Sequence, residues 1–333
     1  MNRKIILTNW TQREDTAGGC ETSYEYMHKV FPDSELVSGI QLCEQMGGNS
    51  SIVCSDKYLL DQYLKDPRLL VIRDAEFGNV LDISKINQIL IFANPFKAIE
   101  NIYKQMGDKT MTYDQDILSP KRILGSKKKV AVSNFMVEEM KKIGFKADYV
   151  IPNCVDTDVF KPMDKESLRK KYNIPSNKQV GIWVGNQTLV KNFGTLMDVV
   201  YNSDIFWIFI TKTYFKKPIE DCAVFLNMNQ KRMSELYNCA DFFLLTSPIE
   251  SCGISSMEAM SCGIPCVLSK TGYFWDFWDK RIGIQVNWDN LEEHLNAVDE
   301  INKIKTDPRQ VIFDQGLDFE NWKKQWEKVV NEN

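Results

Sequence analysis

Residues 241–272 read DFFLLTSPIESCGISSMEAMSCGIPCVLSKTG. Their pattern predicts, in order, a strand at 241–246, a loop at 247–253, a helix at 254–262 and a strand at 265–269. Gly263 and Pro265 end the helix, because glycine accepts the left-handed conformation past a helix end and proline cannot continue a helix. The apolar runs are continuous rather than alternating, which is typical of strands buried on both faces of a parallel sheet.

Similar short apolar runs recur along the chain, separated by helical patterns such as 134–143 and 194–201. The predicted strands are 4–8, 35–38, 51–54, 69–72, 88–93, 129–133, 149–152, 179–185, 205–210, 223–226, 241–246 and 265–269. Strands that alternate with helices predict a doubly wound α/β fold.

The alternation is interrupted between residues 153 and 178. NCVDTDVFKP (153–162) is followed by a charged helix at 164–172 and the turn-like NIPSNK, and then by QVGIWVG, which looks like the first strand of a new domain. We therefore predict a Rossmann-like domain at 1–155 and a second one at 156–318. A terminal helix at 319–333 has Trp322 and Trp326 at helical spacing, so we expect it to pack back toward the first domain.

Composition narrows the class of protein. The formal net charge is −4, which argues against a generally basic nucleic-acid-binding surface but allows a local basic groove. Nine cysteines at irregular spacing, no CxxC pair and two histidines argue against structural zinc and for reduced thiols in a cytoplasm. Residues 1–9 lack the long apolar region of a signal peptide, and no run of 18 apolar residues predicts a membrane span.

Two carboxylates flank the start of the helix predicted at 254, Glu250 before it and Glu258 within it. The amides of residues 251–255 would be unpaired donors at a helix N-terminus, which binds anions, and Gly253 lets the backbone approach closely. A carboxylate repels phosphate but accepts hydrogen bonds from hydroxyls. The arrangement therefore predicts a diphosphate between a ribose and a transferred hexose, whereas the simpler interpretation is that glutamates favour the helix dipole.

The same stretch resembles the donor-binding motif of retaining GT-B glycosyltransferases of glycosyltransferase family 4, E-x7-E within a run similar to E-A-M-A-x-G-x-P-V-V. The matching residues are Glu250, Glu258, Ala259, Met260, Ser261, Gly263, Pro265, Cys266 and Val267. Residues 131–145, 150–162 and 181–200 resemble further family segments in the same order, with Cys154 in place of a glycine. The resemblance covers most of 128–290 and only loosely the first 125 residues. It implies two Rossmann-like domains that face an interdomain cleft.

The resemblance also implies a role for individual residues. Glu250 would contact hydroxyls of the donor sugar and Glu258 the donor ribose, while Lys191 would neutralise the diphosphate, so that Glu250 and Lys191 are the expected catalytic pair. The expected donor-binding residues are Gly18, Gly19, Gly185, Asn186, Lys191, Asn227, Glu250, Cys252, Gly253, Ile254, Ser255 and Glu258. The family usually has arginine at the position of Asn186, so a second cation would come from Lys212 or Arg13, or the diphosphate would be held less tightly.

The N-terminal half offers fewer candidates. Gly18 and Gly19 begin a predicted amphipathic helix whose free amides would meet phosphate or acceptor. The predicted loop 112–122 offers Asp114 or Asp116 to an acceptor hydroxyl, although loop aspartates are usually just solvated. A basic cluster is either a solvated surface or a contact for a phosphorylated acceptor or membrane headgroups, and consists of Lys121, Arg122, Lys127, Lys128 and Lys129.

These patterns predict a cytoplasmic glycosyltransferase, soluble or peripheral to a membrane. It would transfer a hexose or pentose from a UDP-, GDP- or ADP-sugar to a hydroxyl of a glycan, lipid-linked glycan or other acceptor, with retention of configuration. No D-x-D motif follows a predicted strand at the place where a GT-A enzyme would need one, so no metal or other cofactor is expected. Two alternatives stay open: a phage-type enzyme that glycosylates hydroxymethylated DNA bases, and a non-catalytic sugar-nucleotide-binding protein on the same fold.

Overall fold

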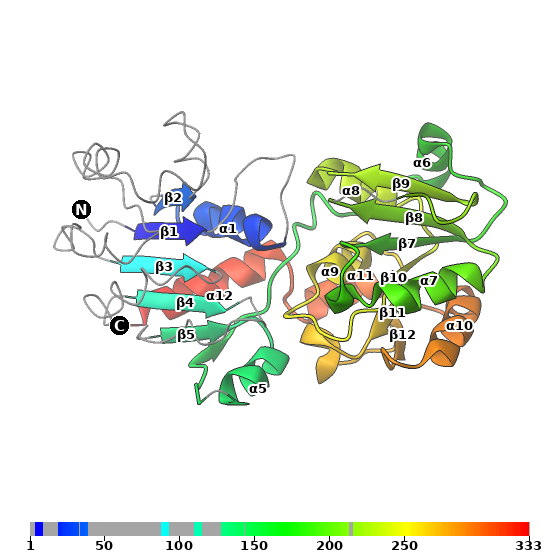
Figure 1. Cartoon of the computed structure of the whole chain (residues 1–333). Helices are drawn as coiled ribbons and strands as arrows, with labels where there is room; N and C mark the ends of the chain where they lie inside the picture. Colours follow the sequence, from blue (N-terminus) through cyan, green and yellow to red (C-terminus); the bar gives the residue numbers. More distant parts are fainter. Residues whose placement is uncertain are drawn as a thin grey trace, which may run out of the picture. The chain divides into compact units, whose positions relative to one another are not determined.

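A computed structural model describes residues 4–8, 19–32, 34–38, 88–92, 110–114, 128–142, 144–212 and 216–332. The chain divides into two compact units, each with its own parallel sheet (Figure 1). Residues 1–151 and 325–333 make up the first unit, and residues 152–324 make up the second. The final helix, α12 (Phe319–Asn331), therefore starts in the second unit and ends in the first.

The sheet of the first unit has the strand order β2-β1-β3-β4-β5-β6, with every neighbouring pair parallel. Its strands are β1 (Lys4–Thr8), β2 (Ser34–Ser38), β3 (Gln88–Phe92), β4 (Thr110–Asp114), β5 (Lys128–Ala131) and β6 (Tyr149–Val150). Helix α1 (Gly19–Val30) buries Tyr26, Met27 and Val30, and α5 (Asn134–Lys142) buries Met136 and Met140. The strands predicted at 51–54 and 69–72 lie outside the described residues.

The second sheet has the order β12-β11-β10-β7-β8-β9, again with parallel neighbours. Its strands are β7 (Val180–Val184), β8 (Phe206–Thr211), β9 (Cys222–Leu226), β10 (Phe242–Leu245), β11 (Cys266–Ser269) and β12 (Gly283–Val286). The helices of this unit are α6 (Lys165–Tyr172), α7 (Phe193–Tyr201), α8 (Gln230–Tyr237), α9 (Ile254–Ser261), α10 (Leu291–Glu300) and α11 (Pro308–Asp314). The chain proceeds outward from β7 through β8 to β9, and then from β10 through β11 to β12.

Strand β10 is buried on both faces, as its continuous apolar run predicted. Phe242 and Leu244 belong to the hydrophobic core shared with Leu196 of α7 and Val298 of α10. Phe243 points the other way, because successive side chains of a strand alternate, and its ring lies 6.1 Å from that of Tyr237 in α8. The helices therefore cover both faces of the second sheet, and the doubly wound α/β prediction is confirmed (Figure 1).

Two strands were not predicted from the sequence. Residues 112–114 were assigned to a loop, but they belong to β4, which pairs with β3 and β5; that assignment is wrong. The D-x-D sequence of Asp114 and Asp116 therefore begins at the last residue of a strand, so the absence of such a motif no longer argues against a metal ion. The sequence of β4, TMTYD, alternates polar and apolar residues instead of forming an apolar run. Strand β12 reads GIQV and occupies the edge of the second sheet, where Gln285 is half-buried, so it also lacks a continuous apolar signal.

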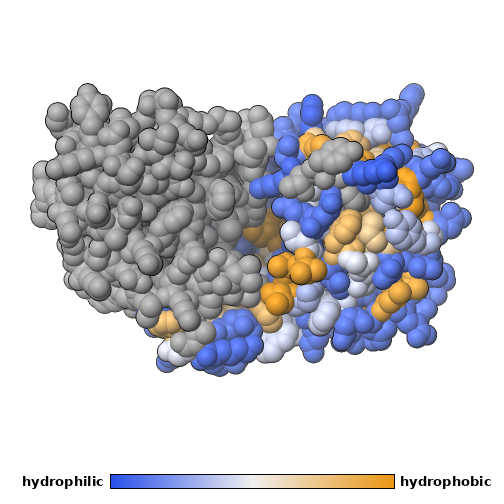
Figure 2. Space-filling model, in the orientation of Figure 1, coloured by the Kyte–Doolittle hydropathy of each residue, from blue (hydrophilic) through white to orange (hydrophobic). Residues whose placement is uncertain are grey.

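The surface of the second unit is mostly hydrophilic in the view of Figure 2, with smaller groups of hydrophobic residues. Among the side chains that the structure describes, Leu189 is the most exposed large apolar one, at 94%. No helix in the described part of the chain is long and apolar enough to cross a membrane. The six cysteines whose side chains are described are all buried and free: Cys154, Cys222, Cys239, Cys252, Cys262 and Cys266.

Candidate active site

Strands β7 and β10 are neighbours from which the chain continues in opposite directions across the sheet. In open α/β sheets, ligands bind at the carboxyl ends of the strands at such a switch point. The segment after β7 contains Gly185 to Lys191, and the segment after β10 contains Thr246 to Gly253. The topology therefore brings the two most informative sequence segments to one edge of the second sheet.

Lys191 and Glu250 form an ion pair at this edge, with 2.5 Å between Nζ and Oε1. Lys191 ends the short 3-10 helix η6 (Leu189–Lys191), and its carbonyl accepts a hydrogen bond from the Thr246 hydroxyl at 2.8 Å. The side chains are 24% and 14% exposed, so the pair is partly shielded from water but still reachable. The structure thus brings together the two residues expected to be catalytic, with a contact to Thr246 that the sequence did not indicate.

Glu250 is positioned by the segment that follows β11. Its amide donates to the Thr271 hydroxyl at 2.9 Å. The next residue, Gly272, has φ +59, and a Cβ on it would lie 2.9 Å from the Cys252 carbonyl oxygen and 3.0 Å from Glu250 Cβ. Only glycine fits this close approach without strain.

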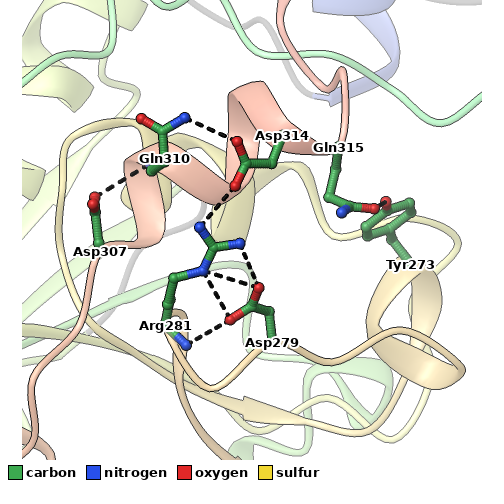
Figure 3. A network of polar contacts seen from close by, with 7 residues as sticks. All are labelled: Tyr273, Asp279, Arg281, Asp307, Gln310, Asp314 and Gln315. Carbon is green, nitrogen blue, oxygen red and sulfur yellow. Dashed lines mark hydrogen bonds and ion pairs between the residues drawn. The ribbon is translucent and has the colours of Figure 1, made fainter.

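Two residues of the same segment, Tyr273 and Arg281, contact the C-terminal end of α11, at Gln315 and Asp314 (Figure 3). Tyr273 donates to the Gln315 side chain at 3.4 Å, while Arg281 bonds Asp314 at 2.7 Å and Asp279 at 2.6 Å. Since exposed ion pairs contribute little stability individually, we interpret this network as fixing the path of the segment rather than as a binding site.

Helix α9 begins at this edge with unused donors. Gly253 precedes it at φ +96 and makes no side-chain cap bond. Within the described part of the chain, the amides of Gly253, Ile254 and Ser255 donate no hydrogen bond. Free amides and the helix dipole together favour an anion at this point. The buried Ser256 hydroxyl also has no partner in the described residues.

Glu258, in the second turn of α9, has a different environment from Glu250. It is 9% exposed, and its Oε2 accepts a hydrogen bond from the Tyr237 hydroxyl at 2.9 Å. Burial raises the pKa of Glu258 to about 7, and the bond from Tyr237 opposes that rise. A carboxylate so placed accepts hydrogen bonds and has lost most of its water, which suits the recognition of hydroxyls.

The remaining donor-site candidates lie at the carboxyl ends of β7, β8 and β9. Asn186 Oδ1 accepts from the Lys212 amide at 3.2 Å and from the Thr211 hydroxyl at 3.4 Å, which ties the end of β7 to the end of β8. The Gly185 amide donates to the Ile210 carbonyl at 3.0 Å. Asn227 has φ +52 and its amide donates to the Thr211 carbonyl at 3.1 Å. Asn186 is thus hydrogen-bonded to the end of β8, and it holds the backbone of Lys212 beside the end of β7.

The candidates in the first unit are only partly described. Gly19 starts α1 and Asp114 is the last residue of β4, while Gly18, Asp116, Lys121, Arg122, Lys127 and Arg13 lie outside the described residues. Lys128 donates to the Val329 carbonyl at 2.9 Å, and the Lys129 amide donates to Asp148 at 2.8 Å. The Lys128 ammonium is therefore engaged by the C-terminal helix rather than fully open to a ligand.

Metal ligation was also considered. In the part of the chain that the structure describes, no group of three or more His, Cys, Asp or Glu side chains is arranged to hold a metal ion. The Lys191 ammonium lies at the edge described above, and the backbone of a second lysine, Lys212, is hydrogen-bonded to Asn186 after β7.

Comparison with known proteins agrees with this geometry. The family model of glycosyl transferases group 1 matches residues 164–310. The chain is similar to N-acetyl-alpha-D-glucosaminyl L-malate synthase of Bacillus anthracis, at 28% identity over 43% of this chain and 41% of that protein. It is also similar to D-inositol 3-phosphate glycosyltransferase of Mycobacteroides abscessus, at 27% identity over 46% of this chain and 38% of that protein. The chain thus spans about two fifths of the length of the curated relatives it matches.

Among solved structures, HepE from Anabaena in complex with UDP-glucose superposes with a TM-score of 0.75 at 15% identity, over 99% of this chain and 100% of that chain. Such a likeness establishes the fold. The chain has the GT-B fold, and its residues 164–310, which contain Lys191, Glu250 and Glu258, match the glycosyl transferases group 1 family.

Proposed function

We propose that this chain is a glycosyltransferase that takes a sugar from a nucleoside diphosphate sugar, retains the anomeric configuration and requires no metal ion. The observation that carries the proposal is the Lys191–Glu250 ion pair at the β7/β10 switch point, together with the unused amides at the start of α9. The match of residues 164–310 to glycosyl transferases group 1 supports it.

In this proposal the donor diphosphate binds at the Gly253–Ser255 amides and draws the Lys191 ammonium from Glu250. Lys191 and the amides stabilise the negative charge that develops as the bond between the anomeric carbon and the diphosphate oxygen breaks. The acceptor oxygen bonds the same carbon from the same face, and its proton passes to the departing diphosphate oxygen. Glu250, released from its lysine, accepts hydrogen bonds from the sugar hydroxyls and orients the ring.

A diphosphate carries more charge than one ammonium neutralises. Lys212 is the neighbouring cation, because the Asn186 side chain accepts the Lys212 amide at 3.2 Å and so holds this residue next to the segment of Lys191. We propose that Lys212 supplies the second positive charge and that Asn186 positions it. We also propose that the backbone at Asn227, which directly follows β9, contacts the nucleotide base.

The acceptor is the least constrained part of the proposal. The names of the curated relatives refer to L-malate and inositol 3-phosphate, which are small hydroxylated molecules. Such acceptors belong in the assay beside glycans, lipid-linked glycans and hydroxymethylated DNA. In the first unit, Asp114 and Asp116 are proposed to face the acceptor, and Gly18 and Gly19 to meet the donor phosphate or the acceptor.

The test begins with thermal unfolding in the presence of UDP-, GDP- and ADP-sugars, because a specific ligand stabilises the folded state. The stabilising donor is then assayed for hydrolysis and transfer with and without EDTA, and the product anomer is read by NMR. We expect turnover that survives EDTA and falls at least about 100-fold in Glu250→Ala.

Glu235→Ala is the matched control, because Glu235 of α8 forms an ion pair of the same length, 2.5 Å, with Lys171 of α6. It should keep full activity. Donor binding without turnover on any acceptor would point instead to a sugar-nucleotide-binding protein, and the absence of binding to any nucleotide would remove the proposal altogether.

A further inference from the structure

Tyr237 is the last residue of α8 and meets α9 through a single polar contact. Its hydroxyl donates to Glu258 Oε2 at 2.9 Å, and Tyr237 itself is 0% exposed. Tyr237 lies outside the segments that resemble glycosyltransferase family 4, and no sequence pattern singles it out. The contact joins two helices across a sequence separation of 21 residues.

The Tyr237 ring is held on two sides. Phe160 lies edge-on with ring centroids 6.1 Å apart, and Phe243 of β10 also lies at 6.1 Å. Phe160 is fixed in turn, since its carbonyl accepts from the Ser261 hydroxyl at 2.5 Å and from Arg309 at 2.9 Å. A tyrosine packed in this way cannot turn its hydroxyl to another partner without repacking the core.

The direction of the hydrogen bond determines what Glu258 can do. Burial and the adjacent Glu258 raise the pKa of Tyr237 well above its ordinary value, so its hydroxyl keeps its proton and donates. The bond occupies Oε2, and Oε1 is left with its lone pairs as an acceptor. Two adjacent hydroxyls on a five-membered ring, as in a ribose, match a carboxylate held in one orientation.

We propose that Tyr237 is a positioning residue that orients the Glu258 carboxylate to accept hydrogen bonds from the ribose hydroxyls of the donor nucleotide. This inference rests on the proposed function, because it takes the ligand of the α9 site to be a nucleoside diphosphate sugar. It extends that function by naming the residue through which α8 contributes to the recognition of the ribose.

The chain contains a matched control. The Tyr172 hydroxyl of α6 also donates to a glutamate, Glu235 of α8. Glu235 forms an ion pair with Lys171 as well, and none of these three residues belongs to the proposed site. Tyr172→Phe and Tyr237→Phe therefore remove the same hydroxyl from the same kind of contact, once outside the site and once within it.

The experiment measures nucleotide affinity by calorimetry. The nucleoside diphosphate that binds the wild-type chain, among UDP, GDP and ADP, is compared with its 2′,3′-dideoxy counterpart. In Tyr237→Phe we expect the affinity for the ribonucleotide to fall about tenfold, while the affinity for the dideoxynucleotide stays within about twofold of the wild-type value. Tyr172→Phe should leave both affinities unchanged.

If the role of Tyr237 is purely structural, Tyr237→Phe will lower the affinity for both nucleotides equally. That result, or an unchanged affinity for the ribonucleotide, would overturn the inference. If Tyr237→Phe does not fold, Glu258→Gln provides the second measurement: loss of the preference for ribose supports the inference, and an intact preference overturns it. A wild-type chain that binds none of the three nucleotides sinks the proposed function itself, and the inference with it.

Discussion

Glu250 and Glu258 are identical side chains eight residues apart, yet their surroundings differ in kind. Glu250 lies in a loop and meets an ammonium, Lys191 Nζ, at 2.5 Å. Glu258 lies in α9, is almost fully buried, and accepts a hydrogen bond from the neutral Tyr237 hydroxyl. One end of the motif is therefore organised by charge and the other by burial and a directed hydrogen bond.

This difference suits the two ends of a nucleotide sugar. The diphosphate and the reacting carbon change their charge during transfer, and a mobile ammonium can follow that change. The ribose keeps its hydroxyls throughout, so a fixed acceptor is sufficient for its recognition. If the two ends are separable in this way, substitutions at one end should leave the other intact.

The largest effect is expected at the charged end. Lys191→Met should lower kcat about 100- to 1000-fold, because it removes the cation that we propose stabilises the leaving diphosphate. Glu250→Gln should raise the affinity for the nucleoside diphosphate without its sugar, because it frees Lys191 from the ion pair. Sugar transfer should nevertheless be lost. Steady-state kinetics and calorimetry measure the two effects.

Lys171→Met is the control for this pair, since Lys171 forms an ion pair of the same length with Glu235. A fall in nucleotide affinity in Glu250→Gln would show that Lys191 does not exchange between the glutamate and the diphosphate.

The next effect is expected at the buried end and concerns stability. Burial raises the pKa of Glu258 from 4.5 to about 7. Because the folded-state value is the higher one, the wild-type chain has its full stability relative to Glu258→Gln below about pH 4.5 and loses it as pH rises through 7. The pKa difference corresponds to about 3 kcal/mol at most.

Urea unfolding of both proteins from pH 5 to pH 8 measures this change. The free energy of unfolding of the wild type relative to Glu258→Gln should fall between pH 5 and about pH 7 and level off above it. A constant difference would mean that Glu258 has the same pKa in the folded and unfolded states.

The surroundings of Glu250 could be predicted from the sequence better than those of Glu258. Glu250, Lys191 and the start of α9 lie at strand ends, and parallel topology brings such ends to one edge, so their proximity follows from the order of elements. The Tyr237–Glu258 contact depends on how α8 packs against α9, and the Glu250–Thr271 bond depends on the path of a loop. Neither packing nor loop path is encoded in hydrophobic periodicity.

The same reasoning explains the missed strands. Both β4 and β12 lack a continuous apolar run, and β12 lies at a sheet edge where only part of its surface is buried. Asp114 was therefore placed in a loop, although it is the last residue of β4.

The smallest effect tests the segment that positions Glu250. Gly272→Ala places a methyl group 2.9 Å from the Cys252 carbonyl oxygen at φ +59, which should cost about 1–3 kcal/mol or shift the loop. Gly194→Ala is the control, because a Cβ there meets nothing within 4 Å and alanine favours the helix by up to about 1 kcal/mol. Since the added methyl group would also lie 3.0 Å from Glu250 Cβ, Gly272→Ala should lower transfer while the preference for ribose over dideoxyribose persists. Loss of both together would mean that the two ends of the motif act as one unit, and the distinction between a charged end and a buried end would fail.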